Sequence, residues 1–187
     1  MFLFKIGGRA FALPPVLYKL NTAMEPHWLT IARKYNGVRE TPGIANSATI
    51  MGWAKRLGAK ILGVAYNADF TPWCGLFIAE VMTEAGFKPP AIAVRASAWD
   101  AFGVPVAKPF LGAVVRFARE GGGHVALITG QDATHYRVLG GNQNDKVSET
   151  WIAKNRAVAL RWPVTKIAPF LLAPMIKRSG AVSTNEA

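Results

Sequence analysis

The chain has 187 residues, of which 51% are hydrophobic and 18% are charged, and its formal net charge is +11. This composition excludes a wholly disordered chain, and the length favours one domain with additional terminal segments. The positive charge favours an anionic partner, which could be nucleic acid, a membrane surface or an acidic polymer.

The two ends of the chain are basic and apolar. Glycine and proline pairs, together with Lys5 and Arg9, interrupt the apolar stretches of residues 1–24, so we expect an N-terminal extension that is not a cleavable signal peptide. Residues 164–187 predict an apolar C-terminal arm that ends in a flexible tail over 179–187. The arm either packs on the domain or, like residues 1–24, docks through residues 164–178 on a partner protein or a membrane surface.

Helical spacing of apolar residues predicts the first half of the domain. One helix is expected over 27–35 and a second over 46–57, which Gly58 would end. After a loop over 58–70, a third helix is expected over 75–86, with Thr71 as its N-cap and Pro72 at N1. Cys74 then lies in the first turn of that helix. A short helix or turn follows over 96–102.

The apolar pattern then changes to a period of two, which predicts five short strands. Their expected ranges are 112–118, 124–129, 135–139, 147–152 and 157–162. Because helices come first and an antiparallel meander follows, the sequence predicts an α+β fold.

Cys74 is the only cysteine, which excludes a disulfide framework and a cysteine-rich zinc site. No calcium-binding loop motif occurs either, and we expect no metal and no cofactor. A lone cysteine can be a small buried hydrophobe. The start of a helix, however, lowers the pKa of a thiol, so Cys74 is also a candidate nucleophile, which needs a base and a residue that orients the base.

His124 and Asn142 are the candidates for those two roles. If Gly130 pairs with His135, His124 lies opposite Gly141 and beside Asn142. Asn142 could then receive a hydrogen bond from the imidazole and fix its tautomer. The alternatives are an ordinary half-exposed histidine at the start of a strand and an ordinary Gly-Gly-Asn turn.

Taken together, these motifs resemble the papain-like peptidoglycan hydrolases of the CHAP type (cysteine, histidine-dependent amidohydrolase/peptidase). The resemblance rests on Thr-Pro-Trp-Cys-Gly-Leu-Phe at 71–77, Gly-His-Val at 123–125 and Leu-Gly-Gly-Asn-Gln at 139–143, and it covers residues 25–163. Gly75 departs from the family pattern, in which many members carry another small residue after the cysteine. The resemblance implies a papain-like α+β domain whose nucleophile helix packs on an antiparallel sheet.

The resemblance also implies a function: cleavage of an amide bond of cell-wall peptide, by a muramoyl-L-alanine amidase or an endopeptidase. Cys74 would be the nucleophile, His124 the general base and acid, and Asn142 the residue that orients His124. Trp73, Trp99 and Ser97 would contact the substrate; the alternative for the two tryptophans is packing in the core, which is favoured for Trp73. Glu40 and Asp69 could hold the loop over the helix start or be ordinary surface or capping residues.

The biological setting that the resemblance implies is a phage-encoded lysin or a tail-associated wall hydrolase. Such a protein is expected in the virion or in the host cytoplasm before release, and it acts in the cell wall or periplasm. A delivered bacterial toxin would use the same chemistry. The partners would be peptidoglycan and, through the ends of the chain, tail or baseplate proteins. The alternatives are a structural or adaptor virion protein on the same scaffold and, last, a nucleic-acid binder, for which the sequence holds no recognised motif.

Overall fold

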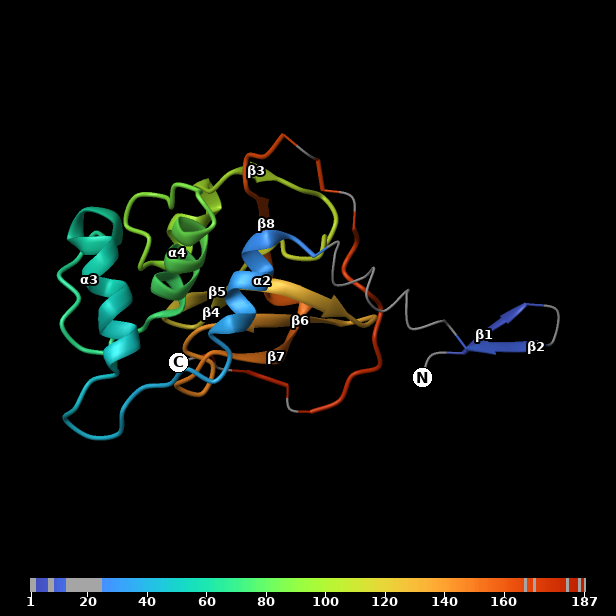
Figure 1. Cartoon of the computed structure of the whole chain (residues 1–187), viewed down its shortest axis with the longest axis horizontal. Coiled ribbons are helices and arrows are strands. Elements are labelled where there is room, and N and C mark those ends of the chain that lie inside the picture. The colour runs from blue at the N-terminus through green and yellow to red at the C-terminus, as the bar shows by residue number, and fades with distance from the viewer. Residues whose placement is uncertain are drawn as a thin grey trace.

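The computed structural model describes residues 3–6, 9–12, 25–166, 168–169, 171–180, 182–184 and 186. Helices and an antiparallel sheet form an α+β fold (Figure 1). The elements in chain order are β1 (Leu3–Ile6), β2 (Arg9–Ala12), α2 (His27–Lys34), α3 (Ala48–Leu62), α4 (Cys74–Glu84), the 3-10 helix η1 (Ala96–Ala101), β3 (Val104–Pro105), β4 (Val114–Arg119), β5 (Gly122–Gln131), β6 (His135–Gly140), β7 (Ser148–Ala153), the 3-10 turn η2 (Lys154–Arg156) and β8 (Ala157–Trp162).

The main sheet has the strand order β3-β8-β4-β5-β6-β7, and every neighbouring pair is antiparallel. Its five long strands confirm the five that the sequence predicts, with boundaries shifted by one or two residues in most cases. The short β3, which pairs with β8, was not predicted. A separate hairpin joins β1 and β2; no strand was expected there, and the rest of residues 1–24 lies outside the described residues.

Helix α4 is the centre of the domain. Every residue from Cys74 to Met82 is buried, and the carboxylate of Glu80 is paired with Arg56. One face of α4 packs on β5 and β6, while α2 and α3 pack on its other sides, so that α4 lies between α3 and the sheet (Figure 1). This position explains why the helix is apolar all round, since an amphipathic helix would have one face in water.

The second predicted helix is longer than expected. Gly58, at which the sequence predicted the end of the helix, has φ of +69° and interrupts the helical geometry. The residues after it are helical again as far as Leu62. Gly63, with φ of +78°, is the left-handed C-cap, and its N–H donates to the Ala59 carbonyl. The sequence shows two glycines that can end this helix, and the buried Leu62 favours the later end.

The start of α4 also differs in detail from the prediction. Trp73, rather than Thr71, is the N-cap residue, and no side chain caps the helix. Thr71 instead accepts a hydrogen bond from the Tyr66 hydroxyl on its carbonyl oxygen. The prediction that Cys74 lies in the first turn is confirmed, since it is the first helical residue.

The C-terminal arm lies along the domain through backbone hydrogen bonds. Leu111 N–H donates to the Leu171 carbonyl, Ala173 N–H to the Pro109 carbonyl, and Ile176 N–H to the Gln131 carbonyl. Further along, Val182 forms a parallel bridge with Trp151 of β7. Of the two alternatives for the arm, packing on the domain is the one seen here, and described residues of the expected flexible tail are hydrogen-bonded as well.

Among the described residues, no helix has both the length and the apolar character needed to cross a membrane.

Candidate active site

Cys74 lies where α4 meets the sheet, and its side chain is 7% exposed. Burial raises the pKa of the thiol, while backbone hydrogen bonds from Val125 and Gly75 and the positive charge of Arg119 act in the opposite direction. The contact with Val125 places the sulfur beside β5, next to His124 in the chain. Gly75 is required here, because a Cβ at this position would collide with the carbonyl oxygens of Ala93 and Val94.

His124 is 1% exposed and is held by a glutamine. Its Nε2 lies 3.1 Å from Oε1 of Gln143, and Nε2 of Gln143 donates to the Ser148 carbonyl oxygen. A carbonyl oxygen can only accept, so the amide of Gln143 must present its own oxygen to the imidazole. His124 therefore carries its proton on Nε2, and Nδ1 is left with a lone pair. Nδ1 is buried and has no hydrogen-bond partner in the described part of the chain.

The prediction that Asn142 orients His124 is wrong in its residue: the neighbouring Gln143 makes that contact. Asn142 has φ of +57° and is buried, and its Oδ1 has no partner among the described residues. The register differs from the assumed one, since Gly130 pairs with Arg137 rather than His135, and a bulge at Thr129 then moves the pairing back by one residue, so that β5 and β6 last pair at Leu127 and Leu139. Continued to His124, this register would still put Asn142 opposite the histidine. However, β6 ends at Gly140 and the positive φ of Asn142 turns the chain, so that Gln143 makes the contact.

Two glycines make room for this arrangement. A Cβ at Gly140 would lie 3.0 Å from Nε2 of His124 and 2.9 Å from Oε1 of Gln143. A Cβ at Gly141 would lie 2.6 Å from Cβ of Phe77 and 2.7 Å from the Trp73 ring. The Gly-Gly pair thus lets the end of β6 pass between α4 and the His124–Gln143 hydrogen bond.

His124 is uncharged at neutral pH in this structure. Burial lowers its pKa to about 4; the Glu186 carboxylate and the Gln143 hydrogen bond oppose this, while the positive charges of Arg119 and Arg156 add to it. Because the pKa of the Cys74 thiol is raised, the resting pair is a neutral thiol and a neutral imidazole. Such a pair can react if the proton moves to Nδ1 as the sulfur attacks.

The three expected substrate-contacting residues have different surroundings. Trp73 and Trp99 are fully buried, and their indole N–H groups donate to Glu40 Oε1 and to the Ala93 carbonyl. Neither indole can line a groove, so for these two the expectation is wrong, and both pack in the core. Ser97 is exposed and lines an open hollow beside η1.

Glu40 and Asp69 hold the loop over the start of α4, as the sequence predicted. Oδ2 of Asp69 accepts the backbone N–H groups of Thr41 at 2.9 Å and Ser47 at 2.7 Å. Oε1 of Glu40 accepts the indole N–H of Trp73 at 2.8 Å, next to the candidate nucleophile.

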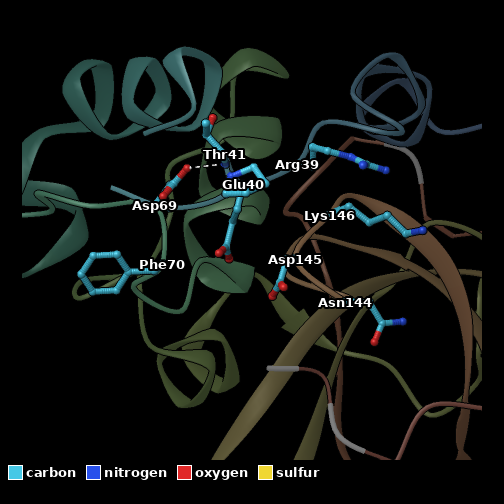
Figure 2. A pocket seen from close by; sticks show the side chains of 10 residues that line it. Arg39, Glu40, Thr41, Asp69, Phe70, Asn144, Asp145 and Lys146 are labelled. Atoms are coloured by element: carbon cyan, nitrogen blue, oxygen red, sulfur yellow. Dashed lines mark hydrogen bonds between the residues drawn. The ribbon is translucent and has the colours of Figure 1, made fainter. Parts of the chain in front are cut away.

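A pocket of about 430 Å³, which the sequence did not predict, lies on this side of the site. Figure 2 shows the carboxylates of Glu40 and Asp145 near one another, with Phe70 across from them. Burial raises the pKa of Glu40, and the charges of Asp145 and Asp69 act in the same direction. The pocket lining thus combines three carboxylates with the basic side chains of Arg39 and Lys146. Its lining residues are Arg39, Glu40, Thr41, Pro42, Gly43, Asp69, Phe70, Asn144, Asp145 and Lys146.

Sequence reasoning missed four residues of the site: Gln143, Arg119, Arg156 and Glu186. Gln143 had a usable signal, because it is a second amide directly after Asn142. The other three had no such signal: Arg119 is the last residue of β4, Arg156 lies in η2 directly before β8, and Glu186 lies in the C-terminal tail. Their charges act on His124 in the folded chain.

No family model matches the chain, and no curated protein matches it. Within the described residues, no group of three or more His, Cys, Asp or Glu side chains is arranged to hold a metal ion.

Proposed function

We propose that the protein is a cysteine hydrolase that cleaves an amide bond of peptidoglycan peptide. The observation that carries this proposal is the combination of Cys74 at the start of α4, beside β5, with His124 on β5, whose Nε2 is fixed by Gln143. A nucleophile at a helix start, a base beside it and an amide behind the base are the parts that nucleophilic amide cleavage needs.

The proposed reaction assigns a role to each of these groups. The sulfur of Cys74 attacks the carbonyl carbon of the amide while Nδ1 of His124 takes the thiol proton. The backbone N–H of Cys74 donates to the oxyanion that forms, because no side chain caps the start of α4. His124 then returns the proton to the departing amine, and water, deprotonated by His124, releases the acyl group from the sulfur. Throughout, Gln143 accepts from Nε2 and stabilises the transient imidazolium.

A papain-like fold and membership of the CHAP type belong to the same proposal. The α+β order, the buried helix that begins with the nucleophile, and the histidine on the antiparallel sheet support it. The net charge of +11 supports an anionic polymer as substrate, because peptidoglycan stems carry free carboxylates. A phage lysin or a tail-associated hydrolase is the setting that the motifs favour.

A second candidate, an inactive scaffold of the same fold, is favoured by one observation. Cys74 and His124 are both nearly inaccessible, at 7% and 1% exposure, so the site is closed in this structure. The scaffold proposal requires that closure to be permanent, whereas the hydrolase proposal requires it to be reversible.

The test is digestion of purified bacterial cell walls, with new amino groups measured by derivatisation and the released muropeptides identified by mass spectrometry. The wild-type chain should release one new class of amino group, while Cys74→Ala and His124→Gln should fall to background. His135→Gln is the matched control, since His135 lies on β6 among Thr134, Asp132 and Arg178 and outside the site.

Two results would contradict the hydrolase. One is a release of amino groups that persists in Cys74→Ala, which would mean that a contaminating enzyme or a different site cleaves the amide. The other is a wild-type chain that is folded, digests no wall and leaves Cys74 unreactive toward iodoacetamide, which would favour the scaffold.

A further inference from the structure

Arg156 and Glu186 form a bidentate ion pair in which the Glu186 carboxylate is buried. Nη1 of Arg156 lies 2.8 Å from Oε1 of Glu186 and Nη2 lies 2.7 Å from Oε2, while the Glu186 side chain has 0% exposure. This is the geometry in which a guanidinium recognises a carboxylate. The Arg156 side chain keeps 20% exposure, and desolvation of the carboxylate offsets much of what such a pair contributes to stability.

The pair lies close to the base of the proposed site. Arg156 directly precedes Ala157, which pairs with Phe117, and Phe117 pairs with His124. Adjacent strands are about 4.8 Å apart, so two strand spacings, about 10 Å, separate this end of β8 from His124. Nε of Arg156 also donates to the Ala118 carbonyl, and Ala118 pairs with Gly123, the residue before His124. The charges of Glu186 and Arg156 both affect the pKa of His124.

Described residues of the segment that precedes Glu186 are hydrogen-bonded to β7 and to Arg156. The N–H of Ser183 donates to the Trp151 carbonyl at 2.8 Å, and the Trp151 indole donates to the Ser179 carbonyl at 3.0 Å. Val182 bridges Trp151 in parallel, and Nη1 of Arg156 also reaches the Ser183 carbonyl. In Figure 1 the arm, drawn in red, runs from β8 around the sheet and returns past β7 to the end marked C. The tail therefore presents a carboxylate to Arg156.

We propose that Arg156 is the residue that binds a carboxylate of the peptide substrate, and that Glu186 fills this subsite until substrate replaces it. The proposal rests on the proposed hydrolase function. A peptide carboxylate can take the place of Glu186 at little cost, because one buried ion pair is exchanged for an equivalent one.

The experiment compares two alkylating reagents on Cys74, the only thiol. Iodoacetate carries a carboxylate and iodoacetamide does not, and the ratio of their rates cancels any change in the thiolate fraction. Glu186→Gln leaves the positive charge of Arg156 uncompensated, and this charge attracts the anionic reagent toward the site although iodoacetate is too short to contact Arg156 while it alkylates Cys74. The iodoacetate-to-iodoacetamide ratio should therefore rise by about threefold. In Arg156→Gln/Glu186→Gln the ratio should return to the wild-type value.

Glu149→Gln is the matched control. Glu149 lies on β7 and pairs with Arg33 and Arg137, away from the site, so its loss should leave the ratio unchanged. All variants are first checked for a cooperative thermal unfolding transition. If Glu186→Gln fails to fold, Glu186→Asp replaces it, since it keeps the charge and withdraws it by one methylene; an intermediate ratio is then expected.

The alkylation ratio and cell-wall digestion separate the two proposals. A ratio that does not rise in a folded Glu186→Gln, or that stays high when Arg156 is also replaced, overturns the subsite. A ratio that behaves as expected in a chain that digests no wall retains the carboxylate subsite and overturns peptidoglycan as its substrate. If both proposals hold, the KM for cell wall falls in Glu186→Gln and rises in Arg156→Gln.

Discussion

At the scale of single residues, the site differs from a pre-formed thiolate–imidazolium pair. The helix start and the N–H of Val125 favour the thiolate, but burial outweighs them and the pKa of Cys74 is raised. The same burial lowers the pKa of His124 to about 4. The structure therefore holds an uncharged pair, and any event that admits water or substrate brings both pKa values back toward their usual range.

Gln143 should matter more than Asn142 for the reaction. In Gln143→Leu, the Nε2–H of His124 loses its acceptor in a buried place, and the imidazolium that forms during the reaction loses its stabilisation. A lost buried hydrogen bond of this kind costs about 1–3 kcal/mol, so kcat should fall about 10- to 100-fold with a smaller change in KM.

The matched variant is Asn142→Gly, which removes the neighbouring side chain and tolerates the positive φ of this position. It should retain more activity than Gln143→Leu in the same cell-wall assay. The opposite order would return the orienting role to Asn142.

At the scale of elements, the sequence predicted most of the fold because burial patterns decide it. The five strands and the helix over α2 follow from apolar periodicity, whereas Cys74 is the first helical residue although Thr71 does not cap the helix. The register of β5 on β6 did not follow, since the bulge at Thr129 leaves no mark in the sequence. Nor did the end of β6 at Gly140 and the positive φ of Asn142, which bring Gln143 rather than Asn142 to His124.

Gly75 and Gly52 provide a matched test of how closely α4 is enclosed. Both lie in helices, but a Cβ at Gly75 would collide with two backbone carbonyl oxygens, whereas a Cβ at Gly52 meets only Nη1 of Arg56, at 3.7 Å. Gly75→Ala should therefore destabilise the fold by about 1–3 kcal/mol. Gly52→Ala should be neutral or stabilise it by up to about 1 kcal/mol.

Denaturant unfolding of both variants measures these changes. Equal effects at the two positions would mean that the backbone at Ala93 and Val94 moves aside freely, and that the loop before η1 does not fix the start of α4.

At the scale of the whole molecule, the C-terminal arm joins parts that the sequence kept apart. It hydrogen-bonds near β4, at the end of β5 and on β7, and then places Glu186 beside Arg156. The composition of the arm could not distinguish packing on its own domain from docking on a partner, since both arrangements bury its apolar residues. In the described part of the tail, Trp151 accepts a hydrogen bond from the N–H of Ser183 and donates one to the carbonyl of Ser179.

The buried His124 makes global stability depend on pH with a definite sign. Its pKa is about 4 in the folded chain and 6.5 for the ordinary side chain, so between these values the unfolded state binds a proton that the folded state does not. The free energy of unfolding should fall as the pH drops from about 6.5 to about 4, by up to about 3 kcal/mol from this residue.

His124→Gln cannot take up that proton, whereas His135→Gln leaves His124 in place. Denaturant unfolding at pH 7 and at pH 4.5 should therefore show a smaller loss in His124→Gln than in the wild type, with His135→Gln close to the wild type. Equal losses in all three chains would mean that His124 is protonated as readily in the folded chain as in the unfolded one, which would make its burial between α4 and β6 incomplete in solution.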